Sequence, residues 1–590
     1  MPRILLFTQC LQNDFVAPVS AGARVPNQLH IGHAEARRLV GDDPATGPLG
    51  RFLRAFYAGA GPGHAVVHIR DWHDAGDPAQ QAHLAHFGPH CLRGTAGAAF
   101  VPPLDDLHDD GVPTRIVDST TLNDFVSTDL EAQIRELLGP VPPAEVVAGI
   151  IGVWTDVKVQ YLAYDLLTRL GFRHIVVCSA LAASRSRVRH FQALDLLAQN
   201  LAVRVVDGIP EFLAALGIGE RAETRPAPAY GVALSGSPLD GEDADLVRHL
   251  FRNCRSVELA PLAGGFSGAR VWRTRSIDQD GRIEVPFVVK TDERAKIAKE
   301  RAAVERVENV LGLSAPTMVD HADLVTRGAI QYMFASMHHS PVAALQRRIA
   351  VARSPEDAAA LLRRVWSNVL CRLSQSPVRD RLQLYGHYGY RPEYAANTLE
   401  RGRALAGDID IAPLETFYAG LPRLLAADPV DAPVAWVHGD LNLANVLLDD
   451  AGNAWLIDYF HTGPAHALKD VAKLENDLKF ILHPVPDEDA LRRALQWEDL
   501  LMRQESLEAA PPALPAALAA DPAIAKSHAA VCEVRSWGKE LCAGVAAMEG
   551  YWIALLRYSA HTTGFEECDR LQRRHALGAS VLAARRLSGA

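Results

Sequence analysis

Residues 437–460, VHGDLNLANVLLDDAGNAWLIDYF, contain three side chains whose types and spacing could support metal-assisted chemistry. Asp440 is followed five positions later by Asn445, and Asp458 comes thirteen positions after that. Two short apolar runs around the turn DDAGN predict a hairpin, with Asp440 and Asn445 at its entry and Asp458 at its exit. Oxygen ligands that converge in this way suit a hard cation such as Mg²⁺, which also binds phosphate oxygens.

A second group of residues, upstream, could bind the phosphates that accompany such a cation. The segment 262–276, LAGGFSGARVWRTRS, contains a glycine-rich turn before a predicted strand. Glycines let backbone amides approach an anion closely and face it. The turn consists of Gly264, Gly265, Phe266, Ser267 and Gly268. Lys290 closes a further predicted strand, EVPFVVK, where its ammonium could meet the α and β phosphates.

Residues 294–312 predict a long helix from their composition and apolar spacing. The helix carries Glu300 and Glu305, either of which could pair with Lys290 and fix its position. A lone HGD or GGFSG is more often an ordinary turn than a site. The ordered set of glycine turn, lysine, helix glutamate, Asp-x4-Asn and aspartate is much more specific, and it indicates a nucleotide-dependent phosphotransferase.

The whole chain sets limits on this hypothesis. Its 590 residues are too many for one hydrophobic core and predict two or more domains. A net charge of -10 argues against nucleic acid as the main partner, because phosphate neutralisation needs clustered Lys and Arg. The eight cysteines form no CxxC pair, which argues against a zinc knuckle or a disulfide framework. The start is not typical of a signal peptide, and no apolar run reaches the ~20 residues of a membrane span, so we expect a cytoplasmic protein without a membrane partner.

A composition change divides the chain. Residues 219–243 are rich in Pro, Gly, Ser and charge, which disfavours packed structure. They predict a linker between an N-terminal domain, 1–218, and a C-terminal domain, 244–590, that fold separately. In the N-terminal domain, apolar runs alternate with helical stretches, which is typical of an α/β fold with a doubly wound parallel sheet. The predicted strands are 3–9, 65–71, 145–150, 174–181 and 201–208.

The C-terminal part, residues 245–590, resembles the aminoglycoside phosphotransferase and choline kinase branch of the protein-kinase-like phosphotransferases. HGDLNLANVLL is close to that branch's catalytic loop, and LIDY stands where its metal-binding IDF or IDW lies. The resemblance implies a bilobal α+β fold and transfer of a phosphoryl group from ATP, with Mg²⁺, to a hydroxyl. In that family, residues at the positions of 331–337 form the hinge that binds adenine, and Asp470 matches a structural acidic position.

The resemblance also implies a role for each candidate residue. Asp440 would be the catalytic base that orients the acceptor hydroxyl. Asn445 and Asp458 would hold Mg²⁺. Lys290, fixed by Glu300, would place the nucleotide phosphates together with the glycine-rich turn.

The nature of the acceptor follows from a departure from protein kinases. After Asp458 the chain passes quickly into a helix, without the long activation segment that ends in Ala-Pro-Glu. This favours a small molecule as the acceptor. The alternative is a regulatory kinase that phosphorylates a protein, with the N-terminal domain as a metabolite sensor.

The N-terminal domain resembles the isochorismatase-like cysteine hydrolases, which include nicotinamidase. The motifs that carry the resemblance are CLQNDF at 10–15, IRDWHD at 69–74, FGPHCLRGTAGA at 87–98, DFVSTDL at 124–130 and GVWTDVKV at 152–159. The family's chemistry needs an aspartate, a lysine and a cysteine nucleophile. Here those positions hold Cys10, Ser119 and Lys158, which implies a pseudoenzyme, because a thioester cannot form without the thiolate.

Three alternatives stay open for Lys158. Lys158 could activate Cys10 in a swapped arrangement, because a nearby cation lowers a thiol pKa. Its ammonium could instead bind an anionic ligand, or it could pair with a neighbouring acidic residue.

Asp71, His73 and His90 match the family's metal ligands, but the remaining histidine is not at its expected spacing. The domain could also mediate homo-oligomerisation.

Overall fold

The structure of the protein is a computed structural model, and it divides into two units, each described by itself. The first unit comprises Met1–Asn309 and Met318–Tyr332, and the second comprises Val310–Thr317 and Met333–Ala590. The expected linker, 219–243, lies inside the first unit, so the domain boundaries drawn from composition stay a prediction. The structure describes residues 3–20, 22–44, 47–105, 111–219, 230–239, 241–262, 269–333, 342–542, 544 and 548–588.

A six-stranded parallel sheet is the centre of the N-terminal part of the first unit. Its strands lie in the order β3-β2-β1-β4-β5-β6, which confirms the predicted parallel α/β sheet. The strands are β1 (Ile4–Gln9), β2 (His64–Asp71), β3 (Thr114–Ser119), β4 (Val147–Val153), β5 (His174–Ala183) and β6 (Arg204–Val206). The strand prediction missed β3, an edge strand that is only partly buried and carries charged residues.

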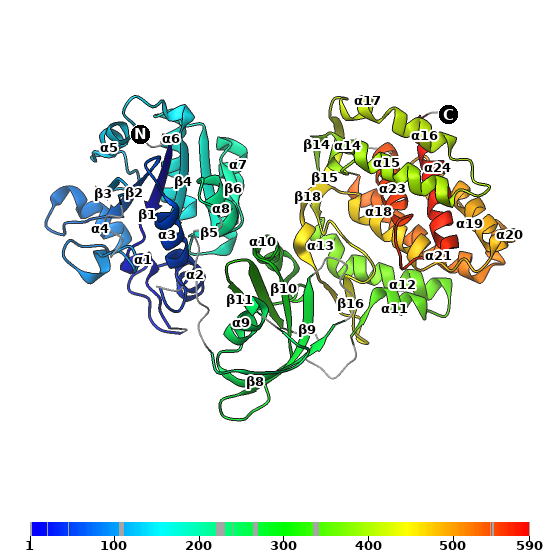
Figure 1. The fold of residues 1–590 in the computed structure, drawn as a ribbon, viewed down its shortest axis with the longest axis horizontal. Helices are drawn as coiled ribbons and strands as arrows, with labels where there is room; N and C mark the ends of the chain where they lie inside the picture. The colour runs from blue at the N-terminus through cyan, green and yellow to red at the C-terminus, as the bar shows by residue number, and fades with distance from the viewer. Residues whose placement is uncertain are drawn as a thin grey trace. The chain divides into compact units, whose positions relative to one another are not determined.

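Helices cover both faces of this sheet, which Figure 1 draws in blue to cyan. One buried cluster packs residues of α2, α3 and α8 against the sheet, and a second packs residues of α5, α6 and α7 against it. On α7, His190, Leu194 and Leu197 recur at helical spacing and are buried, as expected of an amphipathic helix. The helices are α1 (Asn13–Val16), α2 (His33–Leu39), α3 (Pro48–Gly59), α4 (Gln81–Phe87), α5 (Leu130–Leu138), α6 (Gln160–Thr168), α7 (Arg187–Leu201) and α8 (Ile209–Ala215).

A second sheet completes the first unit, in the order β11-β12-β10-β9-β8-β7. Lys290 lies inside β10 rather than at its end, because the strand continues to Glu293. Helix α10 (Arg294–Leu311) follows directly, as predicted. The other elements are β7 (Ala233–Gly236), α9 (Gly241–Leu250), β8 (Cys254–Pro261), β9 (Arg270–Asp278), β10 (Phe287–Glu293), β11 (Met318–Asp323) and β12 (Arg327–Met333).

The second unit is mostly helical and contains two small sheets, β13-β16-β17 and β14-β15-β18. The predicted hairpin is confirmed, since β16 and β17 pair in antiparallel register. The strands are β13 (Ala343–Ala344), β14 (Val378–Leu382), β15 (Val430–Val437), β16 (Val446–Leu448), β17 (Ala454–Leu456) and β18 (Gly463–His466). The helices are α11 (Leu345–Ala350), α12 (Pro355–Val365), α13 (Cys371–Leu373), α14 (Leu384–His387), α15 (Pro392–Leu405), α16 (Ala412–Ala419), α17 (Leu421–Leu425), α18 (Lys469–Asn476), α19 (Glu488–Leu501), α20 (Ala516–Ala519), α21 (Pro522–Ser536), α22 (Gly538–Leu541), α23 (Met548–Thr562) and α24 (Arg570–Ser588).

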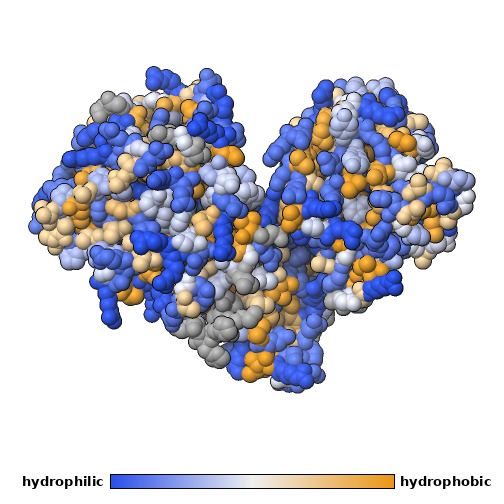
Figure 2. Space-filling view, turned by 180° about the vertical axis from the view of Figure 1, so that it is seen from behind, coloured by the Kyte–Doolittle hydropathy of each residue, from blue (hydrophilic) through white to orange (hydrophobic). Residues whose placement is uncertain are grey.

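The surface of the protein carries both hydrophobic and hydrophilic residues, as the composition of the chain suggests. Figure 2 shows hydrophobic residues interspersed with hydrophilic ones on the face in view. Of the helices in the described part of the chain, none combines the length and the apolar character needed to cross a membrane.

Candidate functional sites

The loop that carries Asp440 is held by two buried carboxylates. Asp470, on α18, accepts the backbone N–H of His438 at 2.6 Å and that of Gly439 at 2.9 Å. A second carboxylate of the same helical stretch, Asp477, accepts the N–H of Leu443 at 3.1 Å. These bonds satisfy N–H groups that would otherwise be buried without partners, so they fix the course of the loop. They also confirm the structural role expected of Asp470.

Gly439 is required by the path of this loop. Its φ of +85° lies in the region that side chains disfavour, and a Cβ there would lie 2.1 Å from the carbonyl oxygen of His461. Three residues further, Asn442 folds the chain by accepting the N–H groups of Ala444 and Asn445 with its side-chain oxygen, at 3.0 and 2.9 Å.

The backbones of the three residues singled out by spacing lie near one another at the base of the β16–β17 hairpin. The side chain of Asn445 donates from Nδ2 to the carbonyl oxygen of Asp440 at 2.9 Å. The N–H of Ile457 donates to the carbonyl oxygen of Asn445 at 3.0 Å, so Asp458 follows directly beside it. Because the amide nitrogen of Asn445 is engaged, its oxygen is the end that can ligate a cation, together with the Asp458 carboxylate. This donor set fits Mg²⁺.

One further residue at this site escaped the sequence analysis. Lys473 places its Nζ 3.3 Å from Oδ1 of Asp440, and its side chain is only 12% exposed. The ammonium also faces the ring of Tyr558, 5.6 Å from the centroid. Its position three residues after Asp470 on α18, which puts both on one helix face, is the signal that could have found it.

The lysine expected at the phosphates forms a buried ion pair in the first unit. Lys290 Nζ lies 2.7 Å from Oε2 of Glu300. Oε1 of Glu300 accepts a hydrogen bond from the hydroxyl of Tyr332 at 3.1 Å, which fixes the carboxylate from a second direction. Glu305, the other candidate, forms an ion pair with Arg187. The glycine-rich turn (Gly264, Gly265, Phe266, Ser267 and Gly268) and residues 334–337 of the expected hinge lie outside the described residues.

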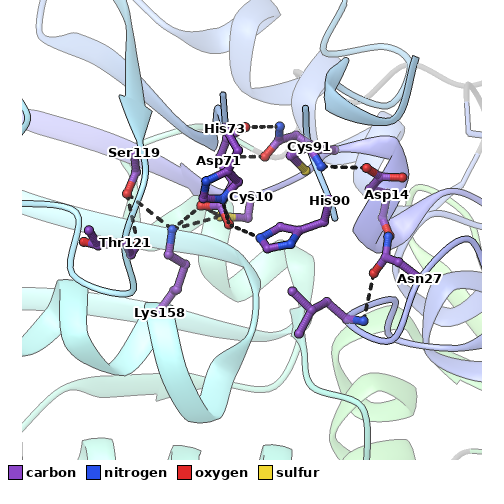
Figure 3. A network of polar contacts seen from close by, with 12 residues as sticks. Cys10, Asp14, Asn27, Asp71, His73, His90, Cys91, Ser119, Thr121 and Lys158 are labelled. Carbon is purple, nitrogen blue, oxygen red and sulfur yellow. Dashed lines mark hydrogen bonds and ion pairs between the residues drawn. The ribbon is translucent and has the colours of Figure 1, made fainter. Parts of the chain in front are cut away.

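In the N-terminal part, Lys158, at the position where the resemblance places the nucleophile, is surrounded by polar neighbours. Figure 3 shows its ammonium against Asp71 and Ser119. It forms ion pairs with Asp71 and Asp124, the latter at 3.0 Å, and lies 3.5 Å from the Ser119 hydroxyl, with 1% of its side chain exposed. Burial disfavours this charge, but the two carboxylates outweigh burial and hold the pKa of Lys158 well above its usual value. This geometry matches the alternative in which Lys158 pairs with acidic neighbours.

Cys10 is not an activated thiol. Its Sγ lies 3.6 Å from Lys158 Nζ and 3.5 Å from Oδ1 of Asp71, and the residue is fully buried. Burial, followed by the Asp71 charge, raises the pKa of the thiol well above its usual value, although Lys158 lowers it. The thiol therefore stays protonated, and the swapped arrangement provides no nucleophile.

Three histidines next to this ion pair have the geometry of a metal site. Candidate ligand atoms of His73, His83 and His90 all lie within 4.8 Å of one another. The Nε2 atoms of all three are buried and have no hydrogen-bond partner among the described residues. Oδ2 of Asp71 lies 3.7 Å from Nε2 of both His73 and His90. Such convergent, unpartnered nitrogens with a carboxylate suit a transition metal such as Zn²⁺.

The sequence analysis missed His83 because it lies ten residues after His73, in HLAHF, away from the expected spacing. Burial, together with His73 and His90, lowers the pKa of His83 to about 4. Its imidazole is therefore neutral near pH 7, which is the state that binds a metal.

Two family models match the chain, each over a different range of residues. A family model described as ternary complex associated domain 9 matches residues 254–401 and 406–563, and the isochorismatase domain model matches residues 6–207. No curated protein matches the chain.

Solved structures similar to the chain cover one part or the other. A pyrazinamidase/nicotinamidase from Streptococcus mutans UA159 is 24% identical, with a TM-score of 0.28, over 34% of this chain and 99% of that one. A nicotinamidase/pyrazinamidase from Bacillus subtilis is 26% identical, with a TM-score of 0.27, over 34% of this chain and 98% of that one. A thermostable mutant of an aminoglycoside phosphotransferase, in ternary complex with ADP and hygromycin B, is 15% identical, with a TM-score of 0.32, over 56% of this chain and 97% of that one.

The loop geometry gives a first prediction. Gly439→Ala should lower the free energy of unfolding by roughly 1–3 kcal/mol, because it adds both an unfavourable φ and a backbone clash. Gly463→Ala is the matched control, since a Cβ there would meet no atom within 4 Å. Equal melting temperatures for the two variants in thermal denaturation would contradict the role given to Gly439.

Proposed function

The chain belongs to the family described as ternary complex associated domain 9, whose model matches just over half of it, and we propose that this part is a phosphotransferase. It transfers the γ-phosphoryl group of ATP, with Mg²⁺, to a hydroxyl of a small molecule. The observation that carries the proposal is the meeting of Asp440, Asn445 and Asp458 at the base of one hairpin, with Asp470 fixing the loop.

Within the second unit, each side chain takes a role from its contacts. Asp440, with 37% of its side chain exposed, accepts the proton of the acceptor hydroxyl and orients it for attack. Asn445 and Asp458 hold the cation, which when bound neutralises charge on the phosphate oxygens. Lys473 holds the Asp440 carboxylate in place and adds a positive charge where negative charge develops.

Within the first unit, the Lys290–Glu300 pair fixes the position of the Lys290 ammonium, which binds the phosphates of the nucleotide. A lysine side chain is long and flexible, and the buried carboxylate of Glu300 limits it to one direction. Tyr332 in turn limits Glu300. A lysine held in this way binds phosphate oxygens without losing further side-chain entropy.

A small-molecule acceptor is favoured by the short connection that follows Asp458. Only a 3₁₀ turn, Tyr459–His461, and β18 separate it from α18. No long segment is therefore available in this stretch to bind an extended peptide beside Asp440. The alternative acceptor is a protein, and parallel ATP-turnover assays with small hydroxyl compounds and with protein extracts distinguish the two.

For the isochorismatase domain we propose a non-hydrolytic role with a bound metal. The paired Lys158 and the protonated Cys10 provide no nucleophile, whereas the three histidine nitrogens are oriented toward one point. The anionic ligand and the homo-oligomer expected for this domain stay predictions.

Phosphoryl transfer is tested with Asp440 and Asp458. Asp440→Asn should keep Mg·ATP binding and lower turnover by at least ~10²-fold, because the positioned base is lost. Asp458→Ala should weaken Mg²⁺-dependent ATP binding, as measured by calorimetry. Asp428→Asn, at an exposed position, is the control and should change neither quantity. Unchanged phosphoryl transfer in both site variants would refute the assignment.

Metal binding is tested by adding Zn²⁺ to chelator-treated, full-length protein and measuring bound metal and melting temperature. We expect one Zn²⁺ per chain and a higher melting temperature, because binding to the folded state stabilises it. His83→Ala should lose both effects, whereas His86→Ala, on an exposed face of the same helix, should keep them. Equal metal content in the two variants would rule out His83 as a ligand.

The hydrolase chemistry is tested with nicotinamide and isochorismate. The full-length protein should release no ammonia from nicotinamide and no product from isochorismate above background, with or without Zn²⁺. Turnover that disappears in Cys10→Ala would overturn the non-hydrolytic role.

A further inference from the structure

Within the first unit, the helix that carries Glu300 packs against the isochorismatase domain. Glu305 of α10 forms an ion pair with Arg187, the first residue of α7. The next residue of α10, Arg306, places its Nη1 2.8 Å from Oδ1 of Asp195, also on α7. The guanidinium groups of Arg187 and Arg306 both lie over the ring of Phe191, 4.5 and 4.4 Å from its centroid. Helix α7 therefore contacts the C-terminal half of α10 through charges and an aromatic ring.

The start of α10 is held by the same domain. Arg294 donates from Nε to Oδ2 of Asp323 at 2.6 Å. Arg51, on α3, forms an ion pair with the same carboxylate and donates to the Asp323 carbonyl oxygen at 2.6 Å. Between these two ends, a Cβ at Gly208 would lie 2.8 Å from the Cβ of Ala298, so the backbone before α8 approaches α10 closely. The isochorismatase domain thus contacts the middle and the C-terminal half of α10 directly, and its start through Asp323 of β11.

These contacts lie on a different face of α10 from Glu300. Arg294, Ala298 and Glu305 are spaced four and seven residues apart, so they project to one side of a helix with 3.6 residues per turn. Glu300 projects to another side, where it meets Lys290 on β10. A rotation or shift of α10 against the isochorismatase domain would therefore move Glu300 relative to Lys290.

The arginines around Glu305 stabilise its charged form, whereas burial and the charge of Arg38 lower the pKa of Arg187 from its usual value. Burial raises the pKa of Glu305, but the charges of Arg187, Arg301 and Arg38 outweigh it and lower the pKa to about 2. The carboxylate is therefore ionised at every working pH. Removing Arg187 would leave a buried negative charge with less compensation, which favours a shift of the helix toward another partner or solvent.

Helix α7, which begins at Arg187, also contacts a turn at the position where the family's nucleophile is expected. That turn, the π-helical segment Thr155–Val159, contains Lys158. Thr155 Oγ1 lies 2.8 Å from Nδ1 of His190 on α7. Ser184, just before α7, donates to Asp156 at 2.6 Å. A continuous set of polar contacts therefore joins the former hydrolase site to the first turns of α7.

We propose that Arg187 is a positioning residue for nucleotide binding, through which the isochorismatase domain sets the orientation of α10 and so the Lys290–Glu300 pair. The inference rests on the proposed phosphotransferase function. In this role the isochorismatase domain acts through its contacts with α10, and it needs no nucleophile. Since a lysine–glutamate pair of this kind must form before phosphates bind productively, a displaced α10 lowers nucleotide affinity.

The test measures the dissociation constant for Mg·ATP and the melting temperature of the full-length protein. Arg187→Met and Glu305→Gln should each weaken Mg·ATP binding at least ~5-fold, in the usual range of coupling between sites. The double variant should be no weaker than the weaker single variant, because both changes break one interaction. Arg204→Met, which removes an exposed pair with Glu211 in the same domain, is the matched control and should leave affinity unchanged.

Lys290→Met separates the two hypotheses. If it does not weaken Mg·ATP binding, the proposed phosphotransferase site is wrong. If it does, and folded Arg187→Met binds Mg·ATP like the wild type, the positioning role of Arg187 is wrong and the phosphotransferase proposal stands. A merely stabilising Arg187 would lower the melting temperature without changing the affinity of the folded protein. Should Arg187→Met unfold at the assay temperature, Arg187→Lys decides in its place, because lysine keeps the charge but loses the two-pronged geometry of the guanidinium.

Discussion

The Asp470 carboxylate is the contact on which the candidate phosphotransferase site depends. It accepts two consecutive backbone N–H groups, and only a chain with glycine at 439 can present both to one carboxylate while passing His461 so closely. Burial raises the pKa of Asp470, and the two N–H bonds act in the opposite direction. The loop, the hairpin and Asp440 all take their positions from this one group.

Helix α18 is in turn fixed by a buried charge network behind it. Glu475 accepts from two nitrogens of Arg535, each at 2.7 Å, and from the hydroxyl of Tyr551 at 2.6 Å. Lys479 lies 2.7 Å from Glu498. Buried charges are costly unless their partners are well aligned, so such a network allows few alternative positions for the helix. On one face of α18, Asp470 and Lys473 contact the loop. On another face, the buried ion pairs fix the helix against its helical neighbours.

In the isochorismatase domain, a buried ion pair occupies the place where the resemblance puts the reactive residues. An ammonium now stands where the nucleophile is expected, and Asp71 and Asp124 neutralise it in a fully buried position. This arrangement supports the proposed non-hydrolytic role, while the adjacent histidines lie close together and Arg187 of α7 pairs with Glu305 of α10. The surface of the domain contacts helix α10 through α7.

The sequence by itself determined the parallel sheet, the β16–β17 hairpin and α10, because apolar periodicity and short-range spacing encode them. It also predicted Asp440, Asn445, Asp458 and Lys290 as members of one candidate site. It could not rank Glu300 against Glu305, since both lie on one helix and only packing decides which faces β10. It missed Lys473 and His83, whose partners Asp440 and His73 meet them only after the chain folds. It also predicted a linker at 219–243, and that boundary stays a prediction. The contacts of α10 with α7, and of Arg51 on α3 with Asp323 on β11, lie within the first unit. Those contacts link residues more than a hundred positions apart, and tertiary structure alone brings such residues together.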